Sequence, residues 1–451
     1  MTDASMPSGG KAAPRKSLMI EDARTKRRNA AEKRFQAYGL AAIAVGVFFL
    51  VVLLWSILAS GLGAFQQTFI ETPIYLDEAK VDKKGNRNPE EMSKTTTFGY
   101  APLIQTALWE QVQAAGIETP FTKSKEMKAL LSDSAAAQVR DYVLSHPEQV
   151  GETVTFRILA ASRVDGYLKG RVVREDLARD KSIDAEHLDV VDRLVDAGVI
   201  RKQFNLDFIV GADASEKRPE QAGLGVAMLG SFYMMLVVLV LALPIGVAAS
   251  IYLEEFAPQN KVTDFIEVNI SNLAAVPSIV FGILGLAAFI QFAHLPMSAP
   301  LVGGLVLTLM TLPTIIISTR ASLKSVPPSI RDAALGVGAS KMQSVFHHVL
   351  PLAMPGILTG TIIGLAQALG ETAPLLLIGM VGYVATNYPD GLVSGFMAPN
   401  SAMPAQIFEW AKRADPAYYE RAWGGIIVLL VFLLTMNIIA IILRRRFERR
   451  W

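Results

Sequence analysis

Long windows without a charged residue most restrict how this 451-residue chain can fold. A helix needs about 20 apolar residues to cross the hydrocarbon core of a bilayer. The windows cover residues 35–70, 221–253, 268–319, 352–379 and 422–443, and Glu371 alone interrupts the fourth. The third window is long enough for two spans, and the turn-rich residues 294–300 (HLPMSAP) divide it. The sequence therefore predicts an all-α polytopic membrane protein with six transmembrane helices.

The distribution of Lys and Arg predicts the orientation of these spans, because cytoplasmic flanks are enriched in both. Nine Lys and Arg residues lie within residues 1–34, one within 252–272, four within 320–350 and five within 444–451. None lies within residues 293–300, and three lie within 379–424. Both termini are therefore predicted to be cytoplasmic, as basic tails. Small residues follow the first span, residues 35–60, as they do at the cleavage site of a signal peptide. The apolar run is too long for a signal peptide and 34 residues precede it, so a retained anchor is favoured.

Residues 61–222 form a polar insert between the first two spans, predicted to be extracytoplasmic. They hold 47 of the 84 charged residues, 26 acidic and 21 basic. Apolar spacing predicts helices over residues 103–115, 125–144 and 187–197, and alternation predicts a strand over 153–159 with a second over 204–210. We expect a small α+β domain. Its carboxylates are interpreted as solvated helix faces, and its histidines show no metal-ligand spacing.

Composition excludes several functions for this chain. There are no cysteines, so disulfides, thiolate metal sites and cysteine nucleophiles are excluded. The net charge of +2 argues against a nucleic-acid partner. No phosphate-binding G-x-x-x-x-G-K-[ST] motif occurs, so ATP hydrolysis by the usual route is not expected here.

The most informative motif lies between the predicted fourth and fifth spans. Residues 331–341 read RDAALGVGASK, and residues 345–351 read VFHHVLP. The small side chains of Ala333 and Ala334 let a partner surface approach closely. Gly338 can adopt the positive φ that ends a helix, and Pro351 marks a helix boundary.

This motif resembles the EAA loop in the inner-membrane permease subunits of bacterial ABC importers. Asp332 stands where that family has Glu, and His348 stands where it has an apolar residue. The resemblance implies a helix, a turn and a second helix that dock onto an ATPase subunit and pass its movement to the membrane helices. It implies this coupling role for Arg331, Asp332, Ala333, Ala334, Gly338, Leu350 and Pro351.

Three further segments resemble phosphate ABC-transporter permeases of the PstA type. They are residues 252–258 (YLEEFAP), 267–282 (EVNISNLAAVPSIVFG) and 370–376 (GETAPLL). The resemblance covers about residues 223–443 and implies the type I ABC importer permease fold. The insert resembles the extra domain of a longer bacterial branch of these permeases.

The family implies an assembly in the bacterial inner membrane. A second permease of the PstC type pairs with this chain, and a dimer of PstB-type ATPase subunits binds ATP and Mg. A periplasmic phosphate-binding protein delivers the substrate. No cofactor is expected in this chain itself.

Glu371 is the only carboxylate deep in a predicted span. A charge at the bilayer centre costs roughly 2.5–3.5 kcal/mol on insertion scales, so we expect Glu371 to face the bundle interior and pair with a basic residue, for instance from the partner permease. Solvation near the water interface is the alternative. Other candidates for the translocation pathway are Thr372, Gln367, Asn272 and Ser278, for which helix–helix hydrogen bonding is an equal alternative.

Related phosphate permeases commonly carry arginines at two positions that correspond here to Ile317 and Gln367. Arg320, one turn beyond Ile317, is therefore predicted to serve near the cytoplasmic mouth. The sequence leaves three other functions open: a permease for molybdate or sulfate, a membrane-anchored sensor, and an intramembrane enzyme. The absence of a large predicted cytoplasmic domain argues against the sensor, and the isolation of Glu371 argues against the enzyme.

Overall fold

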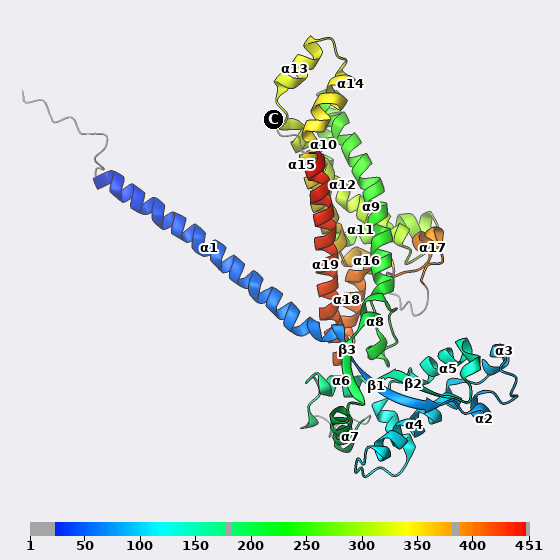
Figure 1. Ribbon diagram of the computed structural model, residues 1–451. Helices are drawn as coiled ribbons and strands as arrows, with labels where there is room; N and C mark the ends of the chain where they lie inside the picture. Colours follow the sequence, from blue (N-terminus) through cyan, green and yellow to red (C-terminus); the bar gives the residue numbers. More distant parts are fainter. Residues whose placement is uncertain (1–22, 176–182, 381–387, 448–451) are drawn as a thin grey trace, which may run out of the picture. The chain divides into compact units, whose positions relative to one another are not determined.

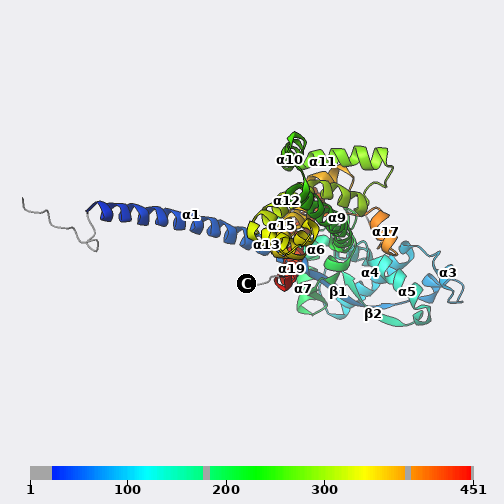
Figure 2. The same cartoon turned by 90° about the horizontal axis from the view of Figure 1, so that it is seen from above.

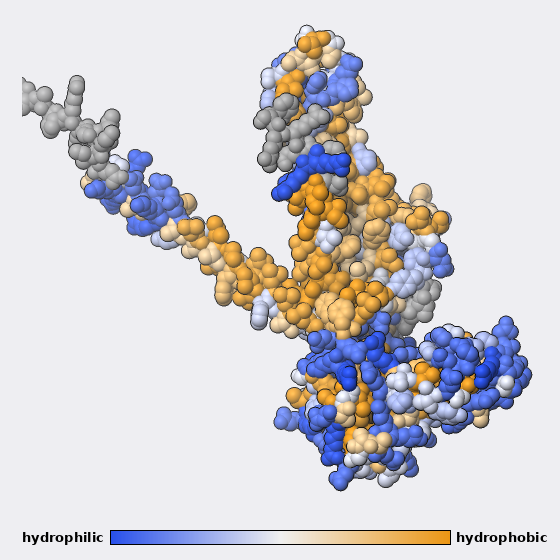
Figure 3. All heavy atoms as spheres, viewed as in Figure 1, coloured by the Kyte–Doolittle hydropathy of each residue, from blue (hydrophilic) through white to orange (hydrophobic). Residues whose placement is uncertain are grey.

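The computed structural model describes residues 23–175, 183–380 and 388–447, and Figure 1 shows their helices and strands. Within these residues, five helical stretches are long and apolar enough to cross a membrane. Their helices, which match five of the six predicted spans, are α1 (Ala23–Gly61), α9 (Gly225–Ile251), α12 (Pro300–Lys324), α15 (Leu350–Gly370) and α19 (Pro416–Phe447). Figure 3 shows hydrophobic surface over the long helices and mainly hydrophilic surface over the insert.

The predicted third span is not one straight helix. Helix α10 (Lys261–Ala274) is followed by α11 (Ser278–Gly285), which continues as a π-helical stretch to Phe292, and the pair is bent by 101°. Pro277 explains the break, because a proline disfavours helical geometry in the residue before it. The residues that the structure describes give six spans only if this bent pair counts as one.

Helices α9, α12 and α15 form the centre of the bundle by packing small residues. Gly304 on α12 lies against Val237 on α9. Three glycines spaced four residues apart on α15 lie against α12: Gly356 against Ser322, Gly360 against Ser318, and Gly364 against Ile315. Such spacing of small residues lets helix backbones approach closely in a membrane. The pairings also show that α15 runs antiparallel to α12.

Shorter helices complete the bundle. Helix α16 (Ala373–Leu377) packs on α11, and α18 (Met403–Lys412) packs on α19. Helices α8 (Leu206–Val210) and α17 (Leu392–Met397) both contact α9. Figure 2 shows α10 and α11 on one side of α12 and α15. Helix α12 is therefore covered by several neighbours, whereas α10 has no buried residue.

The insert contains a three-stranded antiparallel sheet with the order β2-β1-β3. The strands are β1 (Gln66–Tyr75), β2 (Thr153–Leu159) and β3 (Ile200–Phe204). Ile70 at the centre of β1 pairs with Ile158 on one side and Ile200 on the other. The main helices of the insert are α2 (Glu78–Val81), α3 (Pro89–Met92), α4 (Thr97–Ala114), α5 (Ala135–Ser145), α6 (Ser162–Leu168) and α7 (Ala185–Asp196). Strands and helices together enclose a hydrophobic core of their own.

The structure corrects several predictions for the insert. Of the strand predicted over 204–210, only Phe204 is in a strand, as the last residue of β3, because Asn205 caps α8 by accepting a hydrogen bond from the Phe208 amide at 3.1 Å. The helix predicted over 125–144 is split into a 3₁₀ stretch, Ser124–Leu130, and helix α5. Strand β1 was not predicted, since its first half lies inside a charge-free window. The strand over 153–159 and the helix over 187–197 are present as predicted.

Candidate functional site

The segment with the EAA-like motif folds as two short helices joined by a turn. Helix α13 spans Pro328–Gly336, and α14 spans Lys341–Ser344 and continues through a π-helical stretch into α15. Gly338 in the turn has φ = 91°, which favours glycine because it has no Cβ. Ser340 and Gln343 form a reciprocal cap at the start of α14. The S-x-x-Q spacing is a signal for this cap that the sequence analysis did not use.

The two alanines of the motif have different environments. Ala334 is buried against the rest of the loop, whereas Ala333 and Asp332 are exposed. Large apolar side chains are also exposed on this helix–turn–helix: Leu335, Val337, Met342 and Phe346, with Val337 reaching 86% exposure. An exposed apolar group of this kind is typical of a protein-binding surface. We call these four residues and Ala333 the loop surface.

Arg331 points into the protein rather than toward the loop surface. Its Nη2 donates to Glu255 Oε1 at 2.6 Å and to the Leu323 carbonyl at 2.9 Å, and its Nη1 donates to the Val326 carbonyl at 2.8 Å. The Arg331 side chain is 22% exposed and that of Glu255 is 7% exposed. Glu255 lies in the π-helical turn Tyr252–Phe256 that ends α9. This ion pair therefore ties α13 to the end of α9.

Arg320 is held by carboxylates from two other elements. Its Nη2 donates to Glu267 of α10 at 2.6 Å, and its Nε donates to Glu254 after α9 at 3.4 Å. Lys324 lies 3.6 Å from the same Glu254. The charge of Arg320 is thus already balanced within this chain. The geometry favours a role in joining α9, α10 and α12 over direct contact with an anion.

The sequence predicts Glu371 within a continuous span, but in the structure it lies at a break between two helices. Helix α15 ends at Gly370, Glu371 has extended backbone angles, and α16 begins at Ala373. The Gly370 and Pro374 that flank it favour this break. The side chain of Glu371 is half-buried, and its carboxylate has no ion-pair partner in the part of the chain that the structure describes.

The breaks in the third and fifth spans lie at the same level of the bundle. Gly282 of α11 contacts Pro374 of α16, and Gly285 contacts Ile378, so the two helices run in the same direction. Ser278 at the start of α11 is therefore level with Glu371 and Thr372. Arg320 lies elsewhere, because its partners are Glu254 in the turn after α9 and Glu267 of α10.

Gln367 and Asn272 are exposed on the surface of this chain. Gln367 follows the exposed Ile363 by one turn, so both lie on one stripe of α15. Asn272 belongs to α10, and it is exposed as well. Neither side chain is enclosed by this chain alone. The structure thus places Ser278, Glu371 and Thr372 beside the starts of two neighbouring helices, α11 and α16, while Arg320 is bound to Glu254 and Glu267.

A buried group of ion pairs joins the insert to α19, and we call it the junction network. Lys169 Nζ lies 2.7 Å from Asp165 Oδ2 and 3.0 Å from Glu420 Oε1. Arg171 donates to Asp165 at 2.9 Å and also contacts Glu420. Asp165 in addition accepts the amide and hydroxyl of Thr68 on β1.

Arg421 extends the junction network to the segment before α9. Its side chain is almost fully buried, and it donates to Gln67 of β1 at 3.0 Å. It also donates to the carbonyls of Glu220 at 2.8 Å and Ala222 at 3.0 Å. Burial raises the pKa of the Glu220 carboxyl above its usual value. These partners are separated by about 200 to 350 residues, so no sequence pattern reveals them.

Comparison with known proteins identifies the family of the chain. A model of the binding-protein-dependent transport system inner membrane component matches residues 242–451. The Phosphate transport system permease protein PstA 1 of Mycobacterium tuberculosis (strain CDC 1551 / Oshkosh) is 33% identical over 236 residues, which cover 51% of this chain and 74% of that protein. The chain belongs to the PstA-type family of ABC transporter permeases. A domain of unknown function (DUF3333) matches residues 22–177 and is consistent with a longer form of this permease.

Two more relatives are similar to this permease over about half of its chain. The Probable ABC transporter permease protein YqgI of Bacillus subtilis (strain 168) is 31% identical over 226 residues, covering 48% of this chain and 76% of that protein. The Phosphate transport system permease protein PstA of Yersinia pestis is 31% identical over 221 residues, covering 48% and 71%. Among solved structures, the chain is similar to the MetNI methionine ABC transporter with a TM-score of 0.40 and 14% identity, covering 50% of this chain and 97% of that one.

Proposed function

We propose that this permease is a subunit of an ATP-driven importer of inorganic phosphate. The observation that carries the substrate is the 31–33% identity to permeases that are named for phosphate transport in Mycobacterium tuberculosis and Yersinia pestis. The partners are a second permease of the PstC type, a dimer of PstB-type ATPase subunits and a periplasmic phosphate-binding protein. The chain itself is not an enzyme, and ATP and Mg bind to the partner ATPase.

The loop surface is the proposed docking site for the ATPase. Its apolar side chains are exposed, and Ala333 leaves room for a close approach. Motion of the docked loop reaches the spans by two routes. Helix α14 leads without interruption into α15, and the Arg331–Glu255 pair links α13 to α9. Arg331 thus serves coupling by bracing the loop, while Asp332, Ala333 and the turn at Gly338 form the docking region.

The proposed orientation follows from the loop. Docking of the ATPase places the loop surface in the cytoplasm, with residues 1–34 and 444–451 on the same side of the inner membrane. A helix of 27 residues such as α9 is about 40 Å long, which matches the membrane. The insert joins the opposite end of α9 and is therefore periplasmic.

The proposed pathway passes the two helix breaks. Discontinuous helices at mid-membrane are a common way to present unpaired backbone groups to a substrate. Ser278 and Thr372 bring hydroxyl groups to this level, and Gln367 and Asn272 extend the polar surface outward toward the second permease. Glu371 repels an anion, so a basic residue of the second permease is proposed to pair with it and to supply most of the positive charge.

A permease for another oxyanion is the second candidate. It is favoured by Ile317 and Gln367, which stand where related phosphate permeases commonly have arginine, and by the pairing of Arg320 with two carboxylates. Molybdate and sulfate are the relevant competitors. The identity to phosphate permeases outweighs this observation.

Uptake of labelled phosphate at low external concentration tests both parts of the proposal. We expect uptake to fall when the gene is deleted, to return with the wild type and to resist molybdate and sulfate. Ala333→Asp should abolish uptake, because it places a charge on the loop surface without disturbing buried residues. Gln259→Asp adds the same charge to an exposed loop outside α13 and α14, and it should leave uptake intact.

Two results would contradict the proposal. If deletion leaves phosphate uptake unchanged in a strain without another high-affinity system, the substrate is wrong. If Ala333→Asp and Gln259→Asp behave alike, the loop surface is not the docking site.

A further inference from the structure

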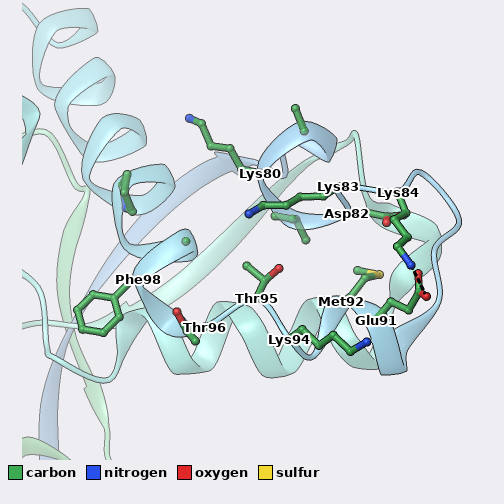
Figure 4. Close-up of a pocket in the computed structure, with 14 residues that line it drawn as sticks. Lys80, Asp82, Lys83, Lys84, Glu91, Met92, Lys94, Thr95, Thr96 and Phe98 are labelled. Atoms are coloured by element: carbon green, nitrogen blue, oxygen red, sulfur yellow. Dashed lines mark hydrogen bonds and ion pairs between the residues drawn. The ribbon is translucent and has the colours of Figure 1, made fainter.

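The insert has a basic pocket that is lined by residues between Ala79 and Pro102, none of which belongs to the junction network. It lies between α2, α3 and the start of α4 and has a volume of about 670 Å³. Its lining includes four lysines, Lys80, Lys83, Lys84 and Lys94, and Phe98. Figure 4 shows Lys80 and Lys83 on one wall and Lys94 on the opposite wall. The insert as a whole carries five more acidic than basic residues, 26 against 21, so this local excess of lysine runs against its overall charge.

The two acids of the pocket are occupied by other groups. Glu91 accepts from Lys84 at 2.8 Å and from Asn86 at 2.7 Å, and these hydrogen bonds lower its pKa. Asp82 accepts the backbone amides of Gly85 at 3.1 Å and Arg87 at 2.6 Å. The Glu91 charge is balanced by Lys84, and the four lysines of the lining still outnumber its two acids.

Two lysines of the pocket keep a free charge. The ammonium groups of Lys83 and Lys94 have no ion-pair partner among residues 23–175, 183–380 and 388–447. Lys80 has only a contact of 3.7 Å with Asp77 on the exposed surface. Such an exposed pair is worth little, so the charge of Lys80 is also available. The pocket is therefore electropositive.

An exposed aromatic ring adjoins these charges. Phe98 is 86% exposed, and Figure 4 shows it at the end of the pocket opposite Lys84 and Glu91. A phenyl ring in water gains from burial against a partner, and aromatic residues are enriched at the centres of protein interfaces. A basic pocket beside an exposed ring is thus suited to a polypeptide with both acidic and apolar groups.

We propose that this pocket is the docking site for an acidic loop of a soluble extracytoplasmic protein. The volume is far larger than an oxyanion, the lysines on its walls are exposed, and the buried polar side chain that lines it, Asp82, is an acid, so a small-anion site is disfavoured. Its concave shape disfavours a flat membrane surface. This inference rests on the proposed function for its location, and under that function the partner is the phosphate-binding protein.

A binding experiment on the full-length chain tests the docking site. The chain is placed in nanodiscs of neutral phosphatidylcholine and titrated with a fluorescent polyglutamate peptide. Replacing Lys83 and Lys94 with Gln should weaken binding about tenfold, because complementary charges at a docking surface are lost. The matched control replaces Lys123 and Lys128, two exposed lysines of the insert outside this pocket, and should bind as the wild type does. Circular dichroism confirms that each variant is folded.

A second measurement uses the assembled transporter. ATPase activity is titrated with the phosphate-loaded binding protein. The Lys83→Gln/Lys94→Gln variant should require about tenfold more binding protein for half-maximal stimulation, with the maximal rate unchanged. Phe98→Ser should shift the same midpoint, since it removes the apolar contact and keeps the charge.

Several results would overturn the inference. Equal weakening in the variant and the lysine control would show nonspecific attraction. Displacement of the peptide by stoichiometric inorganic phosphate would show a small-anion site. Lysine-dependent binding of phosphatidylglycerol vesicles would show a membrane contact. If the phosphate-loaded protein fails to stimulate even the wild type, the proposed function fails, and the polyglutamate titration still decides the docking site.

Discussion

Gly360 offers a sharp test of how the bundle is packed. A Cβ at this position would lie 2.0 Å from Ser318 Oγ and 2.4 Å from Ser318 Cβ, whereas ordinary contact begins at 3.4 Å. A new rotamer of Ser318 moves only Oγ, so α12 and α15 must separate by about 1 Å, the difference between 3.4 and 2.4 Å. Overpacking of this kind costs about 1–3 kcal/mol, which exceeds the gain of about 1 kcal/mol in helix propensity. Gly360→Ala should therefore destabilise the protein.

The assay is the melting temperature of the purified chain in nanodiscs, with phosphate uptake in parallel. Ser318→Gly removes both clashing atoms, so the double variant should regain most of the lost stability. Gly46→Ala is the control, because nothing lies within 4 Å of a Cβ at that position of α1. Wild-type stability of Gly360→Ala, or the absence of rescue by Ser318→Gly, would refute the packing described here.

Three further predictions concern the loop and the junction. Arg331→Gln leaves the Glu255 carboxylate buried without its partner, so the free energy of unfolding should fall by about 1–3 kcal/mol after allowance for partial exposure. An equal fall when Arg331→Gln is made in a Glu255→Gln background would argue against the pair. Gly338 has a positive φ, so Gly338→Ala should lower the free energy of unfolding by about 1–2 kcal/mol and weaken coupling to the ATPase. Gly336→Ala should do neither, although a Cβ at either position has nothing within 4 Å. Glu220 has a raised pKa in the folded state, so its ionisation lowers stability as pH rises. Glu220→Gln should raise the melting temperature at neutral pH, and this gain should disappear below the unfolded pKa of 4.5; a gain independent of pH would contradict the assignment.

The apolar windows predicted most of the membrane fold, because a bilayer imposes a length and a composition on every straight span. They did not predict the bend at Pro277, because the hydropathy of a segment does not show the direction of its helix axis. They also obscured β1, whose residues Gln67 to Ile70 are uncharged and continue the first window. Asn205 was available as a helix-cap signal, and reading it would have prevented the mistaken strand over 204–210.

The candidate site was only partly accessible to sequence reasoning. The turn at Gly338 and the break beside Glu371 have local causes in glycine and proline, so the residues themselves indicate them. The partners of Arg331 and Arg320 lie 53 to 76 residues away and depend on helix packing. The contacts of Lys169 and Arg171 with Glu420 are more distant still and follow from the tertiary fold.

The junction network has a consequence for biosynthesis. Glu420 and Arg421 are synthesised about 200 residues after the insert is complete, which corresponds to a delay of roughly 10–40 s at 5–20 residues per second. During that interval the insert has its own hydrophobic core but lacks its last contacts. The waiting surface includes Asp165, Lys169 and Arg171 beside apolar side chains such as Phe208, and water can solvate its charged part. The charged part of the junction therefore helps the insert to remain soluble until the final span arrives.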